Sequence, residues 1–155
     1  MSDQALLNSF ATDIDTASQL LELLEREFDA LRERDLPRLQ GLLEEKQPLL
    51  LALQQHADER AQCLLAAGVS ADAAGLNQLA DKSPLGEQLI GTSQTLAQHL
   101  QLLQDANLRN GRLIHTNQHA VRSALNVLRG QETPSLYDSR GGASKVTRNR
   151  PLSQA

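Results

Sequence analysis

The sequence predicts an all-α protein, an elongated antiparallel bundle of three long helices with a short helical linker and a flexible C-terminal tail. Leucine supplies 31 of the 155 residues, whereas the chain has one Tyr, two Phe and no Trp. Leucine is a strong helix former, and the β-branched and aromatic residues that favour strands are scarce. A heptad pattern near the N-terminus and the placement of Pro and Gly at helix boundaries point the same way. The length suits one domain.

The first helix is predicted over about residues 3–34. Apolar residues recur there at alternating spacings of three and four, the rhythm of a helix that packs against a partner along one stripe. This heptad seam consists of Leu7, Phe10, Ile14, Ala17, Leu21, Leu24, Phe28 and Leu31. It spans about 37 Å at roughly 1.5 Å per residue. The charged residues assigned to the outer face are Glu22, Glu25, Glu27, Asp29, Arg32 and Glu33.

The second helix is predicted over about residues 36–67, antiparallel to the first because the junction is short. Asp35 offers an N-cap oxygen, Pro37 suits the first turn, and Gly68 is a plausible stop. Its apolar seam consists of Leu39, Leu43, Leu50, Leu53, Ala57 and Leu64. Lys46 and Arg60 fall on the same seam. Pro48 removes one backbone hydrogen bond, so a kink or a short break is expected at residues 44–47.

Residues 68–83 are predicted to be a linker with one short helix at about residues 71–80. The third long helix is predicted over about residues 84–129, with Pro84 in its first turn and Gly130 after its end. Its apolar seam consists of Leu89, Leu96, Leu100, Leu103, Ile114, Val121 and Leu128. The same register includes Ser93, Asn107, Asn110 and Asn117.

Two parts of the chain differ in charge and composition. Residues 1–130, the predicted helical bundle, carry 11 basic and 17 acidic side chains, whereas residues 131–155 carry four basic and two acidic ones. The second part is rich in Gly, Ser, Thr and Asn and is predicted to be a flexible basic tail. Because phosphate contacts provide most nucleic-acid affinity, so acidic a bundle is a poor nucleic-acid binder.

Sites for chemistry are sparse, and the sequence predicts no enzyme, no cofactor and no metal site. Cys63 is alone, and His115 and His119 have metal-binding spacing but no further ligand nearby. His56 and His99 are isolated and are assigned, like the other two, to solvated helix faces. No catalytic triad, phosphate loop or di-iron pattern is found. Neither a signal peptide nor a run of about 20 apolar residues is visible, so a cytoplasmic protein without a membrane span is expected.

Two features of the sequence suggest binding. Asn107, Asn110 and Asn117 interrupt the seam of the third long helix, either in a loosely packed, solvent-open section or where a partner completes the contact. Leu136 and Tyr137 form an apolar pair in the polar tail and precede Asp138. This pair is either a docking motif or a local turn packed on the bundle.

Together these residues resemble the FlgN-type flagellar export chaperones. The likeness starts with the leucine-rich first helix and continues in Asp35-Leu36 followed by Leu39, Leu42, Leu43 and Lys46. More specific segments are Asn107-x-x-Asn110-x-x-Leu113-Ile114 and Leu136-Tyr137-Asp138-x-x-Gly141. The likeness extends over nearly the whole chain, although Pro48 departs from a continuous second helix.

The resemblance implies a cytoplasmic, substrate-specific chaperone for flagellar type III export. Such proteins bind C-terminal helical segments of hook-associated (hook–filament junction) proteins and deliver them to the export gate. The client-binding residues expected on the third helix are Leu100, Leu103, Asn107, Asn110, Ile114, Asn117, Val121, Leu125 and Leu128. The residues expected to dock on the gate are Leu136, Tyr137 and Asp138.

Two other functions stay open at this stage. A structural coiled-coil protein, whose seams satisfy one another in a homo-oligomer, would need no client. A metal-dependent helical-bundle enzyme is the third alternative. The sequence also leaves open a weak homodimer.

Overall fold

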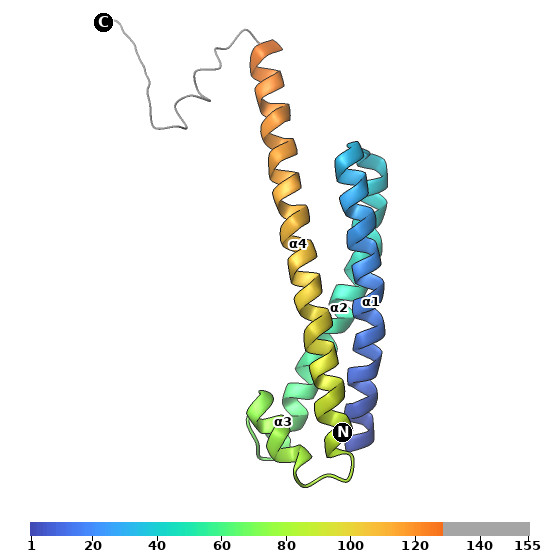
Figure 1. The fold of residues 1–155 in the computed structure, drawn as a ribbon, viewed down its shortest axis with the longest axis vertical. Helices are drawn as coiled ribbons and strands as arrows, with labels where there is room; N and C mark the ends of the chain where they lie inside the picture. Colours follow the sequence, from blue (N-terminus) through green and yellow to red (C-terminus); the bar gives the residue numbers. More distant parts are fainter. Residues whose placement is uncertain (129–155) are drawn as a thin grey trace, which may run out of the picture. The chain divides into compact units, whose positions relative to one another are not determined.

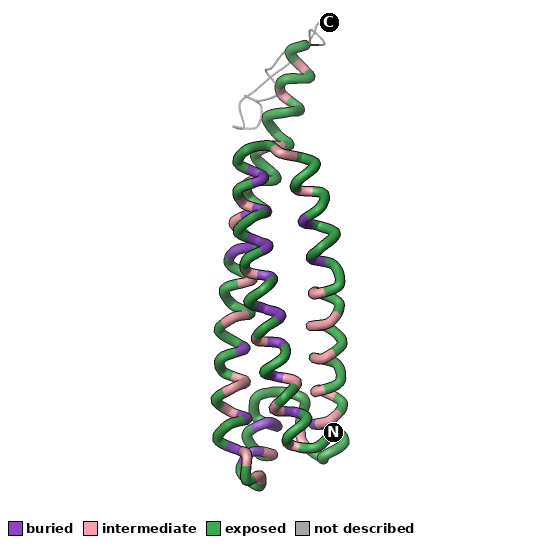
Figure 2. The backbone as a smooth tube through the Cα atoms, turned by 90° about the vertical axis from the view of Figure 1, so that its right-hand side faces the viewer, coloured by how far each residue is buried: buried purple, intermediate pink, exposed green. Residues whose placement is uncertain are grey.

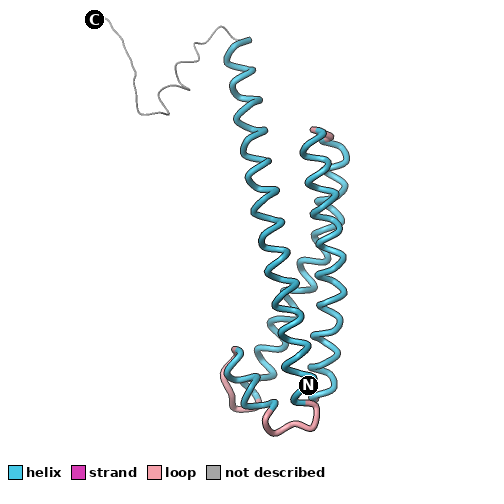
Figure 3. The backbone as a smooth tube through the Cα atoms, viewed as in Figure 1, coloured by secondary structure: helices cyan, strands magenta, loops and turns pink. Residues whose placement is uncertain are grey.

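The computed structural model describes residues 1–128, and this part of the chain is all-helical, with no strand (Figures 1 and 3). Its four helices are α1 (Asp3–Glu33), α2 (Leu36–Ala66), α3 (Ala73–Ala80) and α4 (Gly86–Leu128). The predicted all-α class is confirmed, and α3 lies where the short linker helix was expected. The predicted tail, residues 131–155, lies outside the described residues. The chain divides into two compact units, Met1–Leu113 and Ile114–Ala155.

The helix ends follow from local side-chain chemistry. The Asp35 carboxylate accepts a hydrogen bond from the Arg38 amide at 3.1 Å and caps α2, whose first turn contains Pro37. Arg34 adopts a left-handed conformation with φ 57°, which ends α1 and turns the chain into α2. Gly68, with φ 81°, follows α2 as predicted. Within the first unit, α2 therefore runs back alongside α1 (Figure 1).

Asp72 caps α3 by accepting a hydrogen bond from the Gly75 amide at 2.9 Å. The Ser70 hydroxyl donates a second bond to the same carboxylate oxygen at 2.6 Å. The Ser70 hydrogen bond, followed by the one from the Gly75 amide, lowers the pKa of Asp72 below its ordinary value. Glycine is required at position 75, because a Cβ there would lie 1.7 Å from the Ser70 carbonyl oxygen.

Pro48 lies inside α2, and the helix is uninterrupted from Leu36 to Ala66. Of the two outcomes expected at residues 44–47, the short break does not occur. Proline removes a single amide donor from the helix ladder, and the hydrogen bonds on either side still hold the turns together.

The buried side of α1 is broader than one heptad seam. Four seam positions are buried, but Leu7, Ile14, Leu21 and Phe28 are only half-buried. A neighbouring row of residues, one position before each of these four, is buried instead: Leu6, Asp13, Leu20 and Glu27. The assignment of Glu27 to the outer charged face is therefore wrong. Within the first unit α1 contacts both α2 and α4, and one seam cannot satisfy two neighbours.

Apolar side chains from all four helices form the larger core cluster, which consists of Leu6, Phe10, Ala17, Leu64, Leu76, Leu89 and Leu96. A second cluster, of Leu23, Ala30 and Leu42, joins α1 to the start of α2. In the second unit, none of the described residues 114–128 is buried (Figure 2). This stretch of α4 is helical without an apolar core of its own.

Candidate functional site: two polar layers and the grooves beside them

A buried polar layer ties α1, α2 and α4 together in the first unit. Glu27 on α1 is 2% exposed, and its Oε2 accepts a hydrogen bond from Lys46 Nζ on α2 at 2.7 Å. Asn110 Nδ2 on α4 donates to Glu27 Oε1 at 2.8 Å and to the Leu24 carbonyl oxygen at 2.9 Å. Both carboxylate oxygens are thus satisfied, which is what a buried charge requires. We call these three residues the clamp.

Arg109 extends the clamp toward the surface. Its Nε donates to Asn110 Oδ1 at 3.1 Å, and its Nη1 pairs with Glu25 at 3.1 Å. Its guanidinium carbon lies 4.0 Å from the centroid of the Phe28 ring, within the range of a cation–π interaction. Nη2 is buried and has no hydrogen-bond partner in the part of the chain that the structure describes. The face of the Phe28 ring gives this group a favourable electrostatic neighbour.

A second polar layer lies two heptads away. Asp13, fully buried, accepts from Arg60 Nη1 at 2.7 Å and lies 2.6 Å from His56 Nδ1. Arg60 also donates to Ser9 Oγ at 2.8 Å and stacks on the Phe10 ring. The expectation that His56 lies on a solvated face is wrong, because this side chain is half-buried against the Asp13 carboxylate.

The spacing of the two layers is a signal that sequence reasoning missed. Asp13 and Glu27 are 14 residues apart on α1, and Lys46 and Arg60 are 14 apart on α2. When two helices run antiparallel, two acids on one helix and two cations on the other form two ion pairs if both sets have the same spacing. The cations were recognised on the predicted seam of residues 36–67, but their buried acidic partners were not.

A groove lies beside the clamp, between α2 and α4. Its floor is formed by Leu20 and Leu24 of α1, and its wall on the α2 side by Lys46 and Leu50. On the α4 side it is lined by Leu103, Gln104 and Asn107. The volume is about 240 Å³. We call this the clamp groove.

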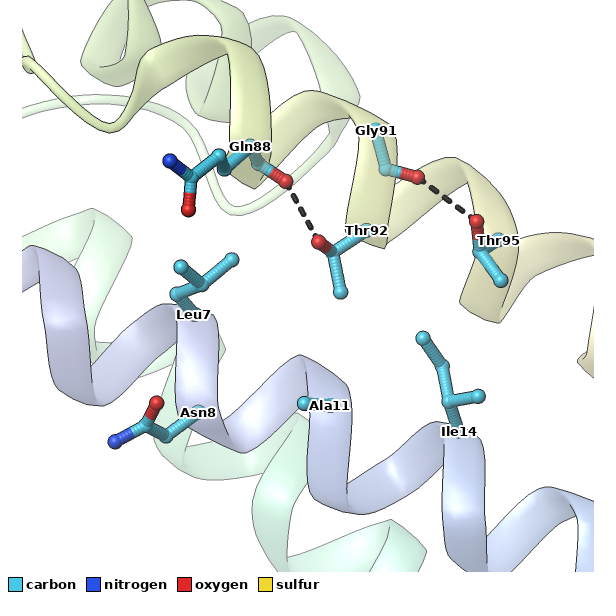
Figure 4. Close-up of a pocket in the computed structure, with 8 residues that line it drawn as sticks. All are labelled: Leu7, Asn8, Ala11, Ile14, Gln88, Gly91, Thr92 and Thr95. Carbon is cyan, nitrogen blue, oxygen red and sulfur yellow. Dashed lines mark hydrogen bonds between the residues drawn. The ribbon is translucent and has the colours of Figure 1, made fainter.

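A second, shallower groove of about 440 Å³ lies between α1 and α4 (Figure 4). Its lining is Leu7, Asn8, Ala11 and Ile14 on one side and Gln88, Gly91, Thr92 and Thr95 on the other. The Thr92 hydroxyl donates to the Gln88 carbonyl at 2.7 Å, and the Thr95 hydroxyl donates to the Gly91 carbonyl at 3.1 Å (Figure 4). These hydroxyls are therefore satisfied by α4 itself, and no titratable group lines this groove.

The residues predicted to bind a client have different environments. In the first unit, Leu100 and Asn107 are exposed and Leu103 is half-buried, whereas Asn110 is 1% exposed. The Asn110 side chain is committed to α1 and offers no surface, so we assign it a structural role. In the second unit, the exposed members are Ile114, Val121, Leu125 and Leu128, and Asn117 is half-buried. The docking residues Leu136, Tyr137 and Asp138 lie outside the described residues.

Residues 1–128 contain neither a metal-site cluster nor a membrane-spanning helix. No group of three or more His, Cys, Asp or Glu side chains there has metal-site geometry. None of the helices in this range has both the length and the apolarity to cross a bilayer.

Comparison with known proteins identifies the family. The model of the FlgN protein family matches residues 1–145. A similar solved structure is that of a Pseudomonas aeruginosa protein assigned as a flagella synthesis protein, FlgN. It is 44% identical, covers 83% of this chain and 98% of its own, and has a TM-score of 0.70. No curated protein matches the chain. The chain belongs to the FlgN protein family.

Proposed function

We propose that this protein is a cytoplasmic chaperone, not an enzyme, for flagellar type III export, and that its clients are hook-associated proteins. Family membership and likeness to a flagella synthesis protein support a flagellar role. The observation that carries the chaperone role is the row of exposed apolar side chains in one heptad register of α4. Its clearest members, Ile114, Val121 and Leu128, all lie in the second unit. Such a stripe accepts an amphipathic helix through contacts at heptad spacing.

Binding through α4 is tested by the double variant Val121→Asp with Leu128→Asp. These side chains are 56% and 82% exposed, so the change removes an apolar contact surface rather than core packing. Burying one such side chain contributes about 1.5–3 kcal/mol, so affinity for the C-terminal helical segment of a hook-associated protein should fall at least about tenfold. Titration calorimetry measures the affinity, and circular dichroism checks the helix content.

Leu108→Asp is the matched control. Leu108 is 54% exposed on the same helix but lies outside the heptad register. The control should bind the client as the unmodified protein does. Equal loss in the control, or unchanged affinity in the double variant, contradicts the placement of the client on this register.

Light scattering with and without client adds a separate check, since a stable homo-oligomer that ignores the client supports a purely structural role.

We assign delivery to Leu136, Tyr137 and Asp138, which follow the helical region and suit a second partner. Tyr137→Ala should leave client affinity within a few-fold and weaken binding to the cytoplasmic domain of the export gate. The reason is that tyrosine contributes a large contact area at low entropic cost. Surface plasmon resonance with each partner separates the two effects. Loss of the client with retention of the gate would reverse the two roles.

A further inference from the structure

The clamp groove combines an apolar floor with unused hydrogen-bond donors. Among the described residues, the Lys46 ammonium has one hydrogen-bond partner, Glu27 Oε2, although an ammonium has three donors. Gln104 and Asn107 are exposed to solvent, so their side-chain amides are open to water in the free protein. Lys46, Gln104 and Asn107 all line the groove. A ligand that displaces water from the groove must therefore place a hydrogen-bond acceptor next to the Lys46 ammonium.

The shape of the groove suits side chains of a helix rather than a small molecule. Its volume of about 240 Å³ lies below the range of about 300–1,000 Å³ for small-molecule pockets. Its edges continue as exposed leucines at helical spacing, Leu43 and Leu50 on α2 and Leu100 on α4. A helix laid between α2 and α4 would cover them as a fourth member of the bundle, with its apolar stripe facing Leu20 and Leu24.

We propose that the clamp groove seats an amphipathic helix whose apolar stripe carries one uncharged acceptor, Asn or Gln, at the level of Lys46. This inference rests on the proposed function and names the chemistry of the client helix. Leucine at that position would seal the Lys46 donors away from water without a partner. A carboxylate would be buried beside Glu27, whose charge already balances Lys46. The neutral acceptor satisfies the donors and adds no charge.

The test uses the full chain and three dye-labelled helical peptides with leucine at the heptad positions. The peptides differ only in the central seam residue, which is Gln, Leu or Glu. Fluorescence anisotropy at neutral pH should show the Gln peptide binding at least about tenfold more tightly than the other two. In the double variant Glu27→Gln with Lys46→Met, the Leu peptide should bind at least as tightly as the Gln peptide, because the ammonium is gone.

Leu50→Asp and Leu51→Asp provide a matched pair that does not disturb the clamp. Leu50 lines the groove. Leu51, the next residue along α2, is also exposed but does not line the groove. Leu50→Asp should abolish binding of the Gln peptide, and Leu51→Asp should leave it unchanged. The inference is overturned if no peptide binds or if all three bind alike. It is also overturned if the Gln peptide still binds more tightly than the Leu peptide to the double variant Glu27→Gln with Lys46→Met, or if Leu50→Asp and Leu51→Asp have the same effect.

A parallel titration with the C-terminal helical segment of a hook-associated protein separates this inference from the proposed function. If that segment binds the unmodified chain while the peptides are not discriminated, only the acceptor rule fails. If the segment does not bind, the chaperone proposal itself fails.

Discussion

Replacing Lys46 by methionine should strongly destabilise the bundle. The substitution keeps most of the aliphatic stem, so little packing is lost. It removes the ammonium 2.7 Å from Glu27 Oε2 and leaves a carboxylate that is 2% exposed with Asn110 as its remaining side-chain partner. Removing one member of a buried ion pair costs about 3–5 kcal/mol. The loss is a large share of the roughly 5–15 kcal/mol that stabilises a typical domain.

The double variant Glu27→Gln with Lys46→Met should recover part of this loss. The glutamine carbonyl still accepts from Asn110 Nδ2, and the carboxylate that would have been buried without its cation is gone. We expect its free energy of unfolding to lie between those of the unmodified protein and the single variant. The buried charge is gone, but the glutamine amide is left without the partner that Lys46 provided at this position, which costs about 1–3 kcal/mol. Urea unfolding followed by circular dichroism at the helix band gives the free energies and the denaturant slopes.

Arg38→Met is the matched control for the ion pair. Arg38 pairs with Glu33 at 3.2 Å, but both side chains are largely in solvent. Its loss should cost at most about 1 kcal/mol. The reasoning is refuted if Lys46→Met costs no more than this control, or if the double variant is as unstable as the single one.

Two further predictions concern the second polar layer and the cap of α3. Asp13→Asn should cost about 3 kcal/mol by urea unfolding, because Arg60 and His56 lose a buried anionic partner, and an undiminished urea midpoint would contradict the assignment. Asp72→Ala should speed hydrogen exchange at the Gly75 amide, whereas Asp72→Asn should preserve the cap. The pKa of Asp72 is lowered in the folded state, so its stabilising effect is present above the ordinary carboxyl pKa and is lost as pH falls through the lowered one. The protection of the Gly75 amide against exchange should therefore fall with pH in the unmodified chain, as Asp72 becomes protonated. In the asparagine variant this loss of protection should not occur.

The helix boundaries were largely predictable because their causes are local. Asp35, Pro37 and Gly68 act through the backbone groups of their own neighbours, and each lies where the structure begins or ends α2. The effect of Pro48 was harder to predict, because a single lost hydrogen bond can end a helix or be tolerated. Which outcome occurs depends on the packing of the turns around it.

The buried acidic groups were not predictable from local sequence, because their burial depends on partners far along the chain. Glu27 has the appearance of a surface residue on a charged helix, and only Lys46 and Asn110 make its burial tolerable. A heptad seam indicates one packing direction. A helix with two neighbours buries a second row, and polar residues in that row look solvated from sequence alone.

The two polar layers fix the register of α1 against α2. A slip of one heptad would place Lys46 opposite Leu20 or Arg34 instead of Glu27, and it would break the Asp13–Arg60 pair at the same time. A seam of leucines alone would discriminate poorly between such registers, whereas buried polar residues specify one at some expense of stability. Under the proposed function this matters for the clamp groove, whose lining comes from three helices. Its floor and walls keep their relative positions only while α1, α2 and the first part of α4 stay in register. The clamp residues are therefore positioned to maintain a binding groove in the absence of its client.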